Sequence, residues 1–130
     1  MKQICIVSED RPNVIAEIIE TVGRIGVNIE TLDSEAISST VVAIMTVDRY
    51  DDALRVLTQS GFSAISEDAL LIRLDDHPGA LAAIAHRFKE ASIPLRSVRI
   101  IRRAEGSGIV ALTTARTDEA LALVKDVLIA

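Results

Sequence analysis

The sequence predicts an α+β protein made of two similar β-α-β-β-α-β units, and three observations lead to this prediction. The first is an internal repeat, because shifting the chain along itself aligns Asp10 with Asp76 and leaves the apolar pattern in step. The second is that short β-branched runs alternate with helical stripes in the same order in both halves. The third is that Pro and Gly stand where these runs meet. We therefore expect repeat 1 over residues 1–67 and repeat 2 over residues 68–130.

The repeat extends past the first loop, with one residue of slip near the middle of each half. Identical pairs follow one another in order along the chain: Ala16 with Ala82, Ile18 with Ile84, Thr46 with Thr113, Arg49 with Arg116 and Asp51 with Asp118. Identities are few, but the same order of elements recurs, so both repeats are expected to have one fold.

The first elements of repeat 1 are a strand over residues 2–8 and a helix over residues 12–26. Pro12 suits the first turn of this helix and Gly26 its end. Apolar residues recur between them at helical spacing: Val14, Ile15, Ile18, Ile19, Val22 and Ile25.

The rest of repeat 1 is predicted as two strands, a second helix and a short last strand, at residues 27–38, 39–47, 49–61 and 62–66. A tight Ser-Ser turn joins the two strands. Asp51 and Asp52 fall in the first turn of the helix, where carboxylates complement the helix dipole.

Repeat 2 follows the same order but runs out of chain. Its predicted strands and helices are residues 68–74, 78–92, 93–103, 108–115 and 117–128. Only Ile129 and Ala130 remain, so the last strand of repeat 2 is expected to be short or missing. Each unit has the ferredoxin-like arrangement, an antiparallel sheet with its helices on one face.

The strands are apolar at successive positions, which predicts that both faces of each sheet are at least partly buried. The helices can cover only one face. We therefore expect another layer on the second face, most simply a second copy of the chain. The alternative is a modest exposed apolar surface.

Composition excludes several classes of protein. The net charge of −5 disfavours binding to nucleic acid or to anionic membranes. Cys5 is the single cysteine, so no intramolecular disulfide can form, and it is expected to be a small buried hydrophobe. No run is long enough for a membrane helix, and Glu9 interrupts any signal-peptide pattern. These features predict a cytoplasmic protein.

The chain has little catalytic equipment. His77 lies in a strand-to-helix loop and His86 in the middle of a helix, and no cluster has the spacing of metal ligands. The arginine-rich stretch over residues 96–103 lies on a strand without the aromatic residues that stack RNA bases. A solvated or salt-bridged strand face is therefore the better interpretation of these arginines.

The strand-to-helix loops over residues 8–14 and 74–80 are the best candidates for a site. A helix N-terminus presents unpaired N–H groups that can hold a carboxylate. Gly79 has no Cβ, so a ligand can approach the backbone there. Good helix-start chemistry alone would explain one such loop, but two copies favour ligand binding.

Residues 7–29 and 72–95 resemble the ACT domain family of regulatory modules. The resemblance is carried by Asp76, Pro78, Gly79 and Leu81 in repeat 2, and by the Gly-x-Asn-Ile stretch ending at Ile29 in repeat 1. It implies a non-catalytic, allosteric regulatory protein in which two ACT repeats join their antiparallel sheets side by side. It also implies a homodimer through sheet faces or edges, an amino acid as ligand, an enzyme or transcription factor as partner, and no cofactor.

The resemblance implies one complete ligand site and one weaker site, each between a first loop and a second strand. The complete site consists of Asp76, His77, Pro78, Gly79, Ala80 and Leu81 with Val27, Asn28 and Ile29. The weaker site consists of Asp10, Arg11, Pro12, Asn13 and Val14 with Pro94. Asn13 stands where the family has glycine, and Pro94 stands where it has asparagine and lacks a backbone donor.

Two other functions compete with amino-acid sensing. One is an interaction module that binds no small ligand. The other is an acyl-phosphate hydrolase of ferredoxin-like fold, in which Arg11 and Asn28 would hold the phosphate and the attacking water.

Overall fold

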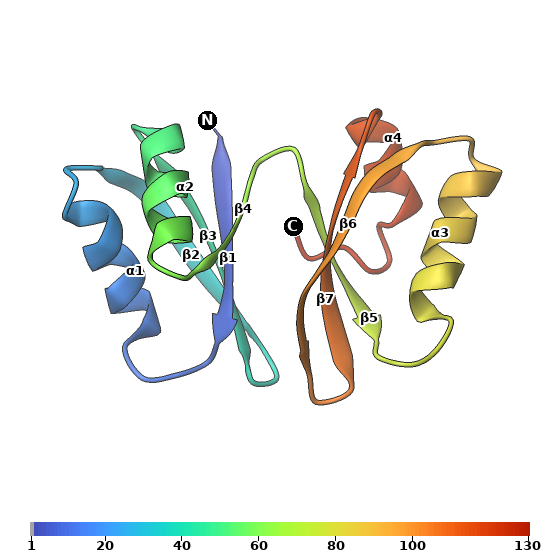
Figure 1. Cartoon of the computed structure of the whole chain (residues 1–130), viewed down its shortest axis with the longest axis horizontal. Helices are drawn as coiled ribbons and strands as arrows, with labels where there is room; N and C mark the ends of the chain where they lie inside the picture. Colours follow the sequence, from blue (N-terminus) through green and yellow to red (C-terminus); the bar gives the residue numbers. More distant parts are fainter. Residues whose placement is uncertain (1) are drawn as a thin grey trace. The chain divides into compact units, whose positions relative to one another are not determined.

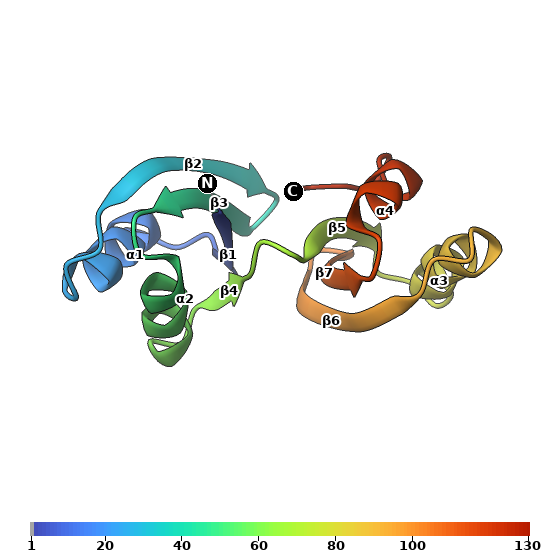
Figure 2. The ribbon, with the colours of Figure 1, turned by 90° about the horizontal axis from the view of Figure 1, so that it is seen from above.

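The computed structural model describes residues 2–130, and these residues form two compact units (Figure 1). Unit 1 ends at Glu67 and unit 2 begins at Asp68. Within each unit an antiparallel sheet carries its helices on one face (Figure 2), which confirms the predicted α+β class. Over residues 2–130, no helix combines the length and the apolar character needed to cross a membrane.

Unit 1 has the predicted β-α-β-β-α-β order. Its elements are β1 (Gln3–Glu9), α1 (Val14–Gly23), β2 (Ile29–Ile37), β3 (Thr40–Val47), α2 (Tyr50–Gln59) and β4 (Ser63–Ile65). The strands lie in the order β2-β3-β1-β4, and every neighbouring pair is antiparallel. Ser38 and Ser39 make the predicted turn between β2 and β3, and Ser38 has a φ of 53°.

The helices of unit 1 cover the face to which alternate residues of the central strands point. Ile4 and Ile6 of β1 lie in this core together with Ala43 and Met45 of β3. This alternation follows from the two-residue period of a strand.

The predicted apolar stripe of α1 is only partly buried. Val14, Ile18 and Val22 lie four residues apart and are almost completely buried. Ile19 and Ile25 are 44% and 37% exposed, so the prediction that they share the buried stripe was wrong. The reason is that a narrow set of positions at i and i+4 already fills the contact with the sheet, and Ile19 lies one residue further round the helix.

Unit 2 repeats this order without a full last strand. Its elements are β5 (Leu70–Asp75), α3 (Ala80–Glu90), β6 (Leu95–Ala104), β7 (Ser107–Thr114) and α4 (Thr117–Leu123). The strands lie in the order β5-β7-β6 and pair antiparallel. Its core lies between the sheet and the helices and includes Leu70, Ile72, Ile84, Phe88, Val110 and Leu112.

The C-terminal residues take the place of the missing strand. The Leu71 N–H donates to Ala130 O at 2.8 Å, and the Ile129 N–H donates to Leu71 O at 2.7 Å. A single antiparallel bridge joins Ile72 to Leu128. This confirms the prediction that the last strand of repeat 2 is short or missing.

Helix α4 ends at Leu123, although the periodicity predicts a helix up to residue 128. The Arg73 N–H donates to Val127 O at 2.9 Å, which satisfies the edge of β5 with backbone that a helix could not offer. Arg87 donates to both carboxylate oxygens of Asp126 at 2.6 and 2.9 Å. The hydrogen bonds from Arg87 lower the pKa of Asp126. Sheet pairing therefore outweighs helix propensity in this segment.

In both repeats an arginine hydrogen-bonds to the turn that follows the first helix. In unit 1 Arg49 donates to Ile25 O at 2.9 Å and to Asp52 at 2.8 Å. In unit 2 Arg116 donates to Ser92 O. Hydrogen bonds from Arg49 are the main cause that lowers the pKa of Asp52. The repeat found in the sequence therefore extends to side-chain contacts.

The face of each sheet away from the helices also carries apolar residues, as predicted. In unit 1 these include Cys5, Val7 and Val42, and in unit 2 they include Leu71, Ile109 and Ala111. Cys5 is buried, as expected for a small hydrophobe, and burial raises the pKa of its thiol.

Candidate ligand-binding site

The loop between β5 and α3 ends in a glycine with left-handed backbone geometry. Gly79 has a φ of 88° and is the N-cap of α3, which begins at Ala80. Pro78 therefore precedes the helix, and the prediction that it lies in the first turn was wrong. No atom lies within 4 Å of the position that a Cβ on Gly79 would take. A ligand can therefore reach the backbone here, as a side chain at this position would not permit.

The first turn of α3 leaves several backbone donors without an acceptor. Ala80 N–H donates to His77 O at 3.2 Å, and Ala83 N–H donates to Gly79 O at 2.9 Å. Within the described part of the chain, the N–H groups of Gly79, Leu81 and Ala82 have no acceptor. Because glycine supplies no capping side chain, these donors remain available to an anion.

The loop is held at the end of the sheet where β6 turns into β7. The Asp76 N–H donates to Gly106 O at 2.8 Å. The Asp76 carboxylate lies 3.4 Å from the guanidinium of Arg103, the penultimate residue of β6. These contacts tie the Gly79 loop to the C-terminal end of β6.

The corresponding loop of unit 1 has the same backbone geometry. Asn13 is the N-cap of α1 and has a φ of 66°. Asp10 N–H donates to Ser39 O at 2.8 Å, and Glu17 N–H donates to Asn13 O at 2.9 Å. Asparagine adopts the left-handed region more readily than most residues, so the substitution of the expected glycine leaves the turn unchanged. Here the helix begins at Val14, again after the proline.

A cleft opens beside each loop, between the start of the helix and the edge strand. The cleft of unit 2 has a volume of about 70 Å³ and is lined by Leu74, Asp75, Asp76, His77, Ala80, Leu81, Ile100, Arg103, Gly108 and Val110. The cleft of unit 1 is wider, about 330 Å³, and is lined by Asp10, Arg11, Asn13, Val14, Ile15, Ala16, Ser34, Glu35, Ala36 and Val41. The two clefts occupy equivalent places in the two repeats.

The predicted residues of the second strand of unit 1 serve its own structure. Val27 is 5% exposed and belongs to the core, and Ile29 packs against the same core. The Asn28 N–H donates to Asp48 Oδ1 at 2.9 Å, and its side-chain amide lies 3.4 Å from Asp48 Oδ2. The Asn28 side-chain oxygen remains available as an acceptor. In unit 2, Pro94 O accepts from Thr114 Oγ1 at 2.8 Å.

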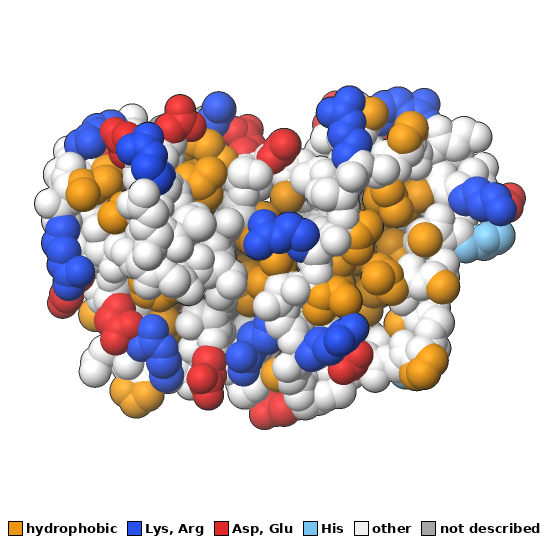
Figure 3. Space-filling view, in the orientation of Figure 1, with side chains coloured by type: hydrophobic (Ala, Val, Ile, Leu, Met, Phe, Trp, Pro, Cys, Tyr) orange, Lys and Arg blue, Asp and Glu red, His pale blue; other side chains and the backbone are white. Residues whose placement is uncertain are grey.

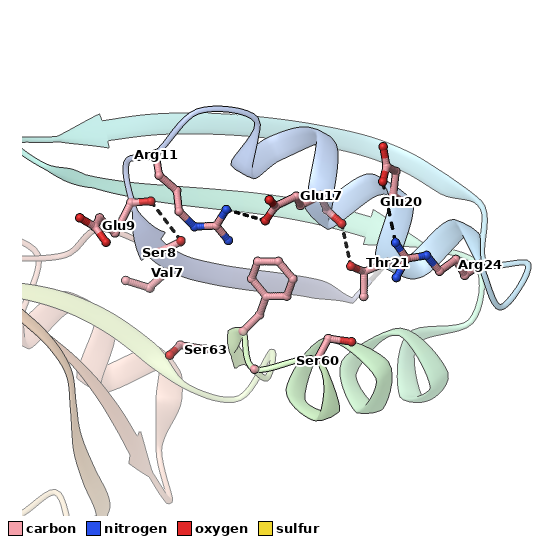
Figure 4. A pocket seen from close by; sticks show the side chains of 12 residues that line it. Val7, Ser8, Glu9, Arg11, Glu17, Glu20, Thr21, Arg24, Ser60 and Ser63 are labelled. Carbon is pink, nitrogen blue, oxygen red and sulfur yellow. Dashed lines mark hydrogen bonds and ion pairs between the residues drawn. The ribbon is translucent and has the colours of Figure 1, made fainter.

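Arg11 takes part in a different feature, a groove of about 660 Å³ within unit 1 that the sequence did not predict. Arg11 lies 2.5 Å from Glu17, and Arg24 lies 3.9 Å from Glu20 (Figure 4). These pairs line the α1 side of the groove, and residues 60–63 line the other side. Because its arginines already pair with glutamates of the same wall, the groove offers a ligand little unpaired positive charge.

The geometry disfavours the hydrolase hypothesis. Arg11 precedes α1 and Asn28 follows it. A helix of 10 residues therefore separates them, which is a span of about 15 Å. Arg11 also pairs with Glu17 in the first turn of α1 and Asn28 bonds to Asp48, so the two side chains do not converge on one phosphate.

The histidines have no metal-site geometry. His77 Nδ1 lies 3.0 Å from Pro78 O, and His86 Nε2 lies 3.7 Å from Glu90 on the surface of α3. In residues 2–130, no group of three or more His, Cys, Asp or Glu side chains could hold a metal ion.

The two long edge strands carry opposite charges at equivalent positions. On β2, the register with β3 places Asp33 and Glu35 on the face away from the helices. On β6, the register with β7 places Arg99 and Arg102 on the corresponding face. From the sequence these arginines were expected to form a solvated or salt-bridged face. The signal for their complementarity with β2 is the difference in charge between aligned positions of the two repeats.

No family model and no curated protein sequence matches the chain. Protein BT0572 from Bacteroides thetaiotaomicron is 18% identical in sequence and has a TM-score of 0.51, over 98% of this chain and 90% of that one. The ligand-free regulatory subunit of aspartate kinase from Thermus thermophilus is 17% identical, with a TM-score of 0.45 over 97% of this chain and 91% of that one. The small subunit of acetolactate synthase from Thermotoga maritima is 13% identical, with a TM-score of 0.42 over 99% and 89%. The likeness to BT0572 is one of fold, and it agrees with the resemblance to the ACT domain family stated from the sequence.

Proposed function

We propose that the protein is a non-catalytic, cytoplasmic regulator that binds a small amino acid at the Gly79 loop. The observation that carries the proposal is the uncapped start of α3, where a left-handed glycine leaves three N–H groups free beside an open cleft.

The ligand's carboxylate would accept hydrogen bonds from the backbone of the first turn of α3. Leu81 and Ala82 supply two of these donors, and the positive end of the helix dipole favours the anion. A hydrogen bond to a charged group contributes about 1.5–3 kcal/mol.

We further propose that β6 of one copy pairs antiparallel with β2 of a second copy. This pairing sets Arg102 and Arg99 against Asp33 and Glu35, so opposite charges face each other along the seam. Among residues 2–130, both strands lie at the edge of their sheets. Charge complementarity of this kind favours one register and suppresses pairing of two like strands.

The same pairing brings Asn28 of the second copy to the ligand. Antiparallel strands place the start of β2 beside the end of β6, which is the end that holds the Gly79 loop through Asp76 and Gly106. The free side-chain oxygen of Asn28 could then accept a hydrogen bond from the ligand's ammonium group.

The site at the unit 1 loop is proposed as the weaker of the two. Asp10, Arg11, Pro12, Asn13 and Val14 would face Pro94 of the second copy. Proline offers no N–H and no side-chain amide, so this site has fewer groups to recognise an amino acid.

Regulation would follow from the coupling between ligand binding and copy association. A ligand that bridges two copies favours the paired arrangement by its difference in affinity for the two states. A partner enzyme or transcription factor that recognises the paired sheet would then respond to the amino acid.

Calorimetry against the twenty amino acids tests the proposal, with Gly79→Asn as the variant. Asparagine tolerates the positive φ, as Asn13 shows, but its side chain fills the open space over the loop. We expect one or a few amino acids to bind the natural protein, and we expect Gly79→Asn to lose the tighter of the binding events.

Gly61→Asn is the matched control, because Gly61 also has a positive φ and open space around its Cβ position. It should bind as the natural protein does. The interaction-module hypothesis predicts instead that no amino acid binds either protein below millimolar concentration, and that outcome would end the sensing proposal.

A further inference from the structure

We propose that the cleft beside the Gly79 loop accepts the side chain of a small branched aliphatic amino acid, such as valine, isoleucine or leucine. This inference rests on the proposed binding of an amino acid at this loop and names the class of ligand. Its starting point is Ile100, which is 45% exposed although its partner across the sheet, Val110, is 3% exposed. An exposed isoleucine next to a core valine leaves apolar surface that a ligand could cover.

The walls of the cleft are apolar and come from four elements of unit 2. Leu74 lies on β5, Leu81 on α3, Ile100 on β6 and Val110 on β7. Figure 3 shows hydrophobic side chains gathered at the surface between β6 and α3. The cleft therefore continues the core of unit 2 outward to the loop that would hold the ligand's carboxylate.

The size of the cleft limits the side chain that fits. Its volume is about 70 Å³. A single water needs about 10–15 Å³ by this measure, so there is room for about five atoms of that size. Three or four aliphatic carbons fit this space, whereas the rings of phenylalanine and tryptophan exceed it.

The charges at the mouth do not favour a charged side chain inside. Asp76 and Arg103 pair with each other at 3.4 Å, so neither is left as a dedicated partner. A charged side chain buried between the aliphatic walls would lose its hydration and would gain no ion-pair partner to compensate. The cleft therefore selects against aspartate, glutamate, lysine and arginine.

The equivalent cleft of unit 1 is also lined by apolar residues, among them Val14, Ile15 and Val41, but it differs in size and at one wall position. Ser34 occupies the position that Ile100 has in unit 2, since each lies opposite an apolar residue of the next strand in the same register. Glu35 and Asp10 also line that cleft, which is about 330 Å³. The close fit to a small branched side chain is therefore proposed for unit 2, whose cleft is smaller and has Ile100 in its wall.

Calorimetric titration of the full chain with single amino acids tests the inference. We expect valine, isoleucine and leucine to bind at least about tenfold more tightly than alanine, because each further methylene fills part of the cleft. Phenylalanine, aspartate and lysine should bind more weakly than valine.

Ile100→Ala is the diagnostic variant and Val98→Ala its matched control. Val98 lies on the same strand and face and is 40% exposed, but it does not line the cleft. Both residues are exposed, so neither truncation should unfold the protein, and circular dichroism verifies this. Ile100→Ala should weaken valine binding about tenfold, and Val98→Ala should change it less than about twofold.

The outcomes separate this inference from the proposed function. If an aspartate, lysine or aromatic ligand binds most tightly, or if the two variants weaken valine binding equally, the aliphatic cleft is refuted while amino-acid binding stands. If no amino acid binds and Gly79→Asn behaves like the natural protein, both fall.

Discussion

Reversing the charge of β6 should disrupt the proposed association of two copies. In the double variant Arg99→Glu and Arg102→Glu, two attractive contacts with Asp33 and Glu35 become repulsive at each seam. An exposed ion pair contributes about 0.5 kcal/mol, and a like-charge pair opposes association by a similar amount. A symmetric dimer has two seams, so the loss is about 4 kcal/mol, or about three orders of magnitude in dimer affinity.

Sedimentation equilibrium over a range of protein concentrations measures this change. The double variant Lys89→Glu and Lys125→Glu alters the net charge equally but lies outside β6, so it should leave the dimer intact. Asp33→Arg with Glu35→Arg, added to the reversed β6, should restore association. A dimer that survives reversal of β6 unchanged would refute pairing through these edges.

Three further predictions concern unit 2 and the ion pairs. Truncation of the fully buried Phe88 to alanine should lower the free energy of unfolding by about 3–5 kcal/mol in urea denaturation, because it leaves a cavity in the core. Arg87→Ala should speed hydrogen exchange at the Arg73 amide, which donates to Val127 O, and unchanged exchange would show that Arg87 does not hold the C-terminal segment. Pairing with Arg87 lowers the pKa of Asp126, so this ion pair stabilises the fold at pH values above the ordinary aspartate pKa of about 3.9. The stabilisation is lost as the pH falls through the lowered pKa. Asp126→Asn should therefore make the free energy of unfolding depend less on pH in the acid range.

The repeat and the order of elements could be predicted from sequence because both depend on local period and turn chemistry. Gly79 adopts the positive φ that its residue type permits, whereas Ser38 turns the chain at the predicted place with a positive φ that serine seldom takes. The end of α4 could not be predicted in the same way. Leu123 is followed by residues with helical periodicity. These residues instead hydrogen-bond to the edge of β5, which lies far away in the sequence, and so form a strand-like segment.

Part of the candidate site could also be predicted from the sequence, and part could not. The left-handed turn follows from the Asp-x-Pro-Gly stretch, so the loop around Gly79 could be proposed from the sequence. The cleft could not, because it needs Ile100 and Leu81 to meet from different elements. The opposite charges of β2 and β6 can be read from the sequence. That they are complementary follows only from the register, which places Asp33 and Arg99 on equivalent faces of the two sheets.

A titration of the labelled protein with valine, followed by the backbone amide resonances, tests the central claim most directly. The account predicts saturable downfield shifts at Gly79, Leu81 and Ala82, because these N–H groups would gain the carboxylate as acceptor. Asn13 and its neighbours should shift less. Saturable binding that leaves the three amides of α3 unchanged would contradict a site built on the start of that helix.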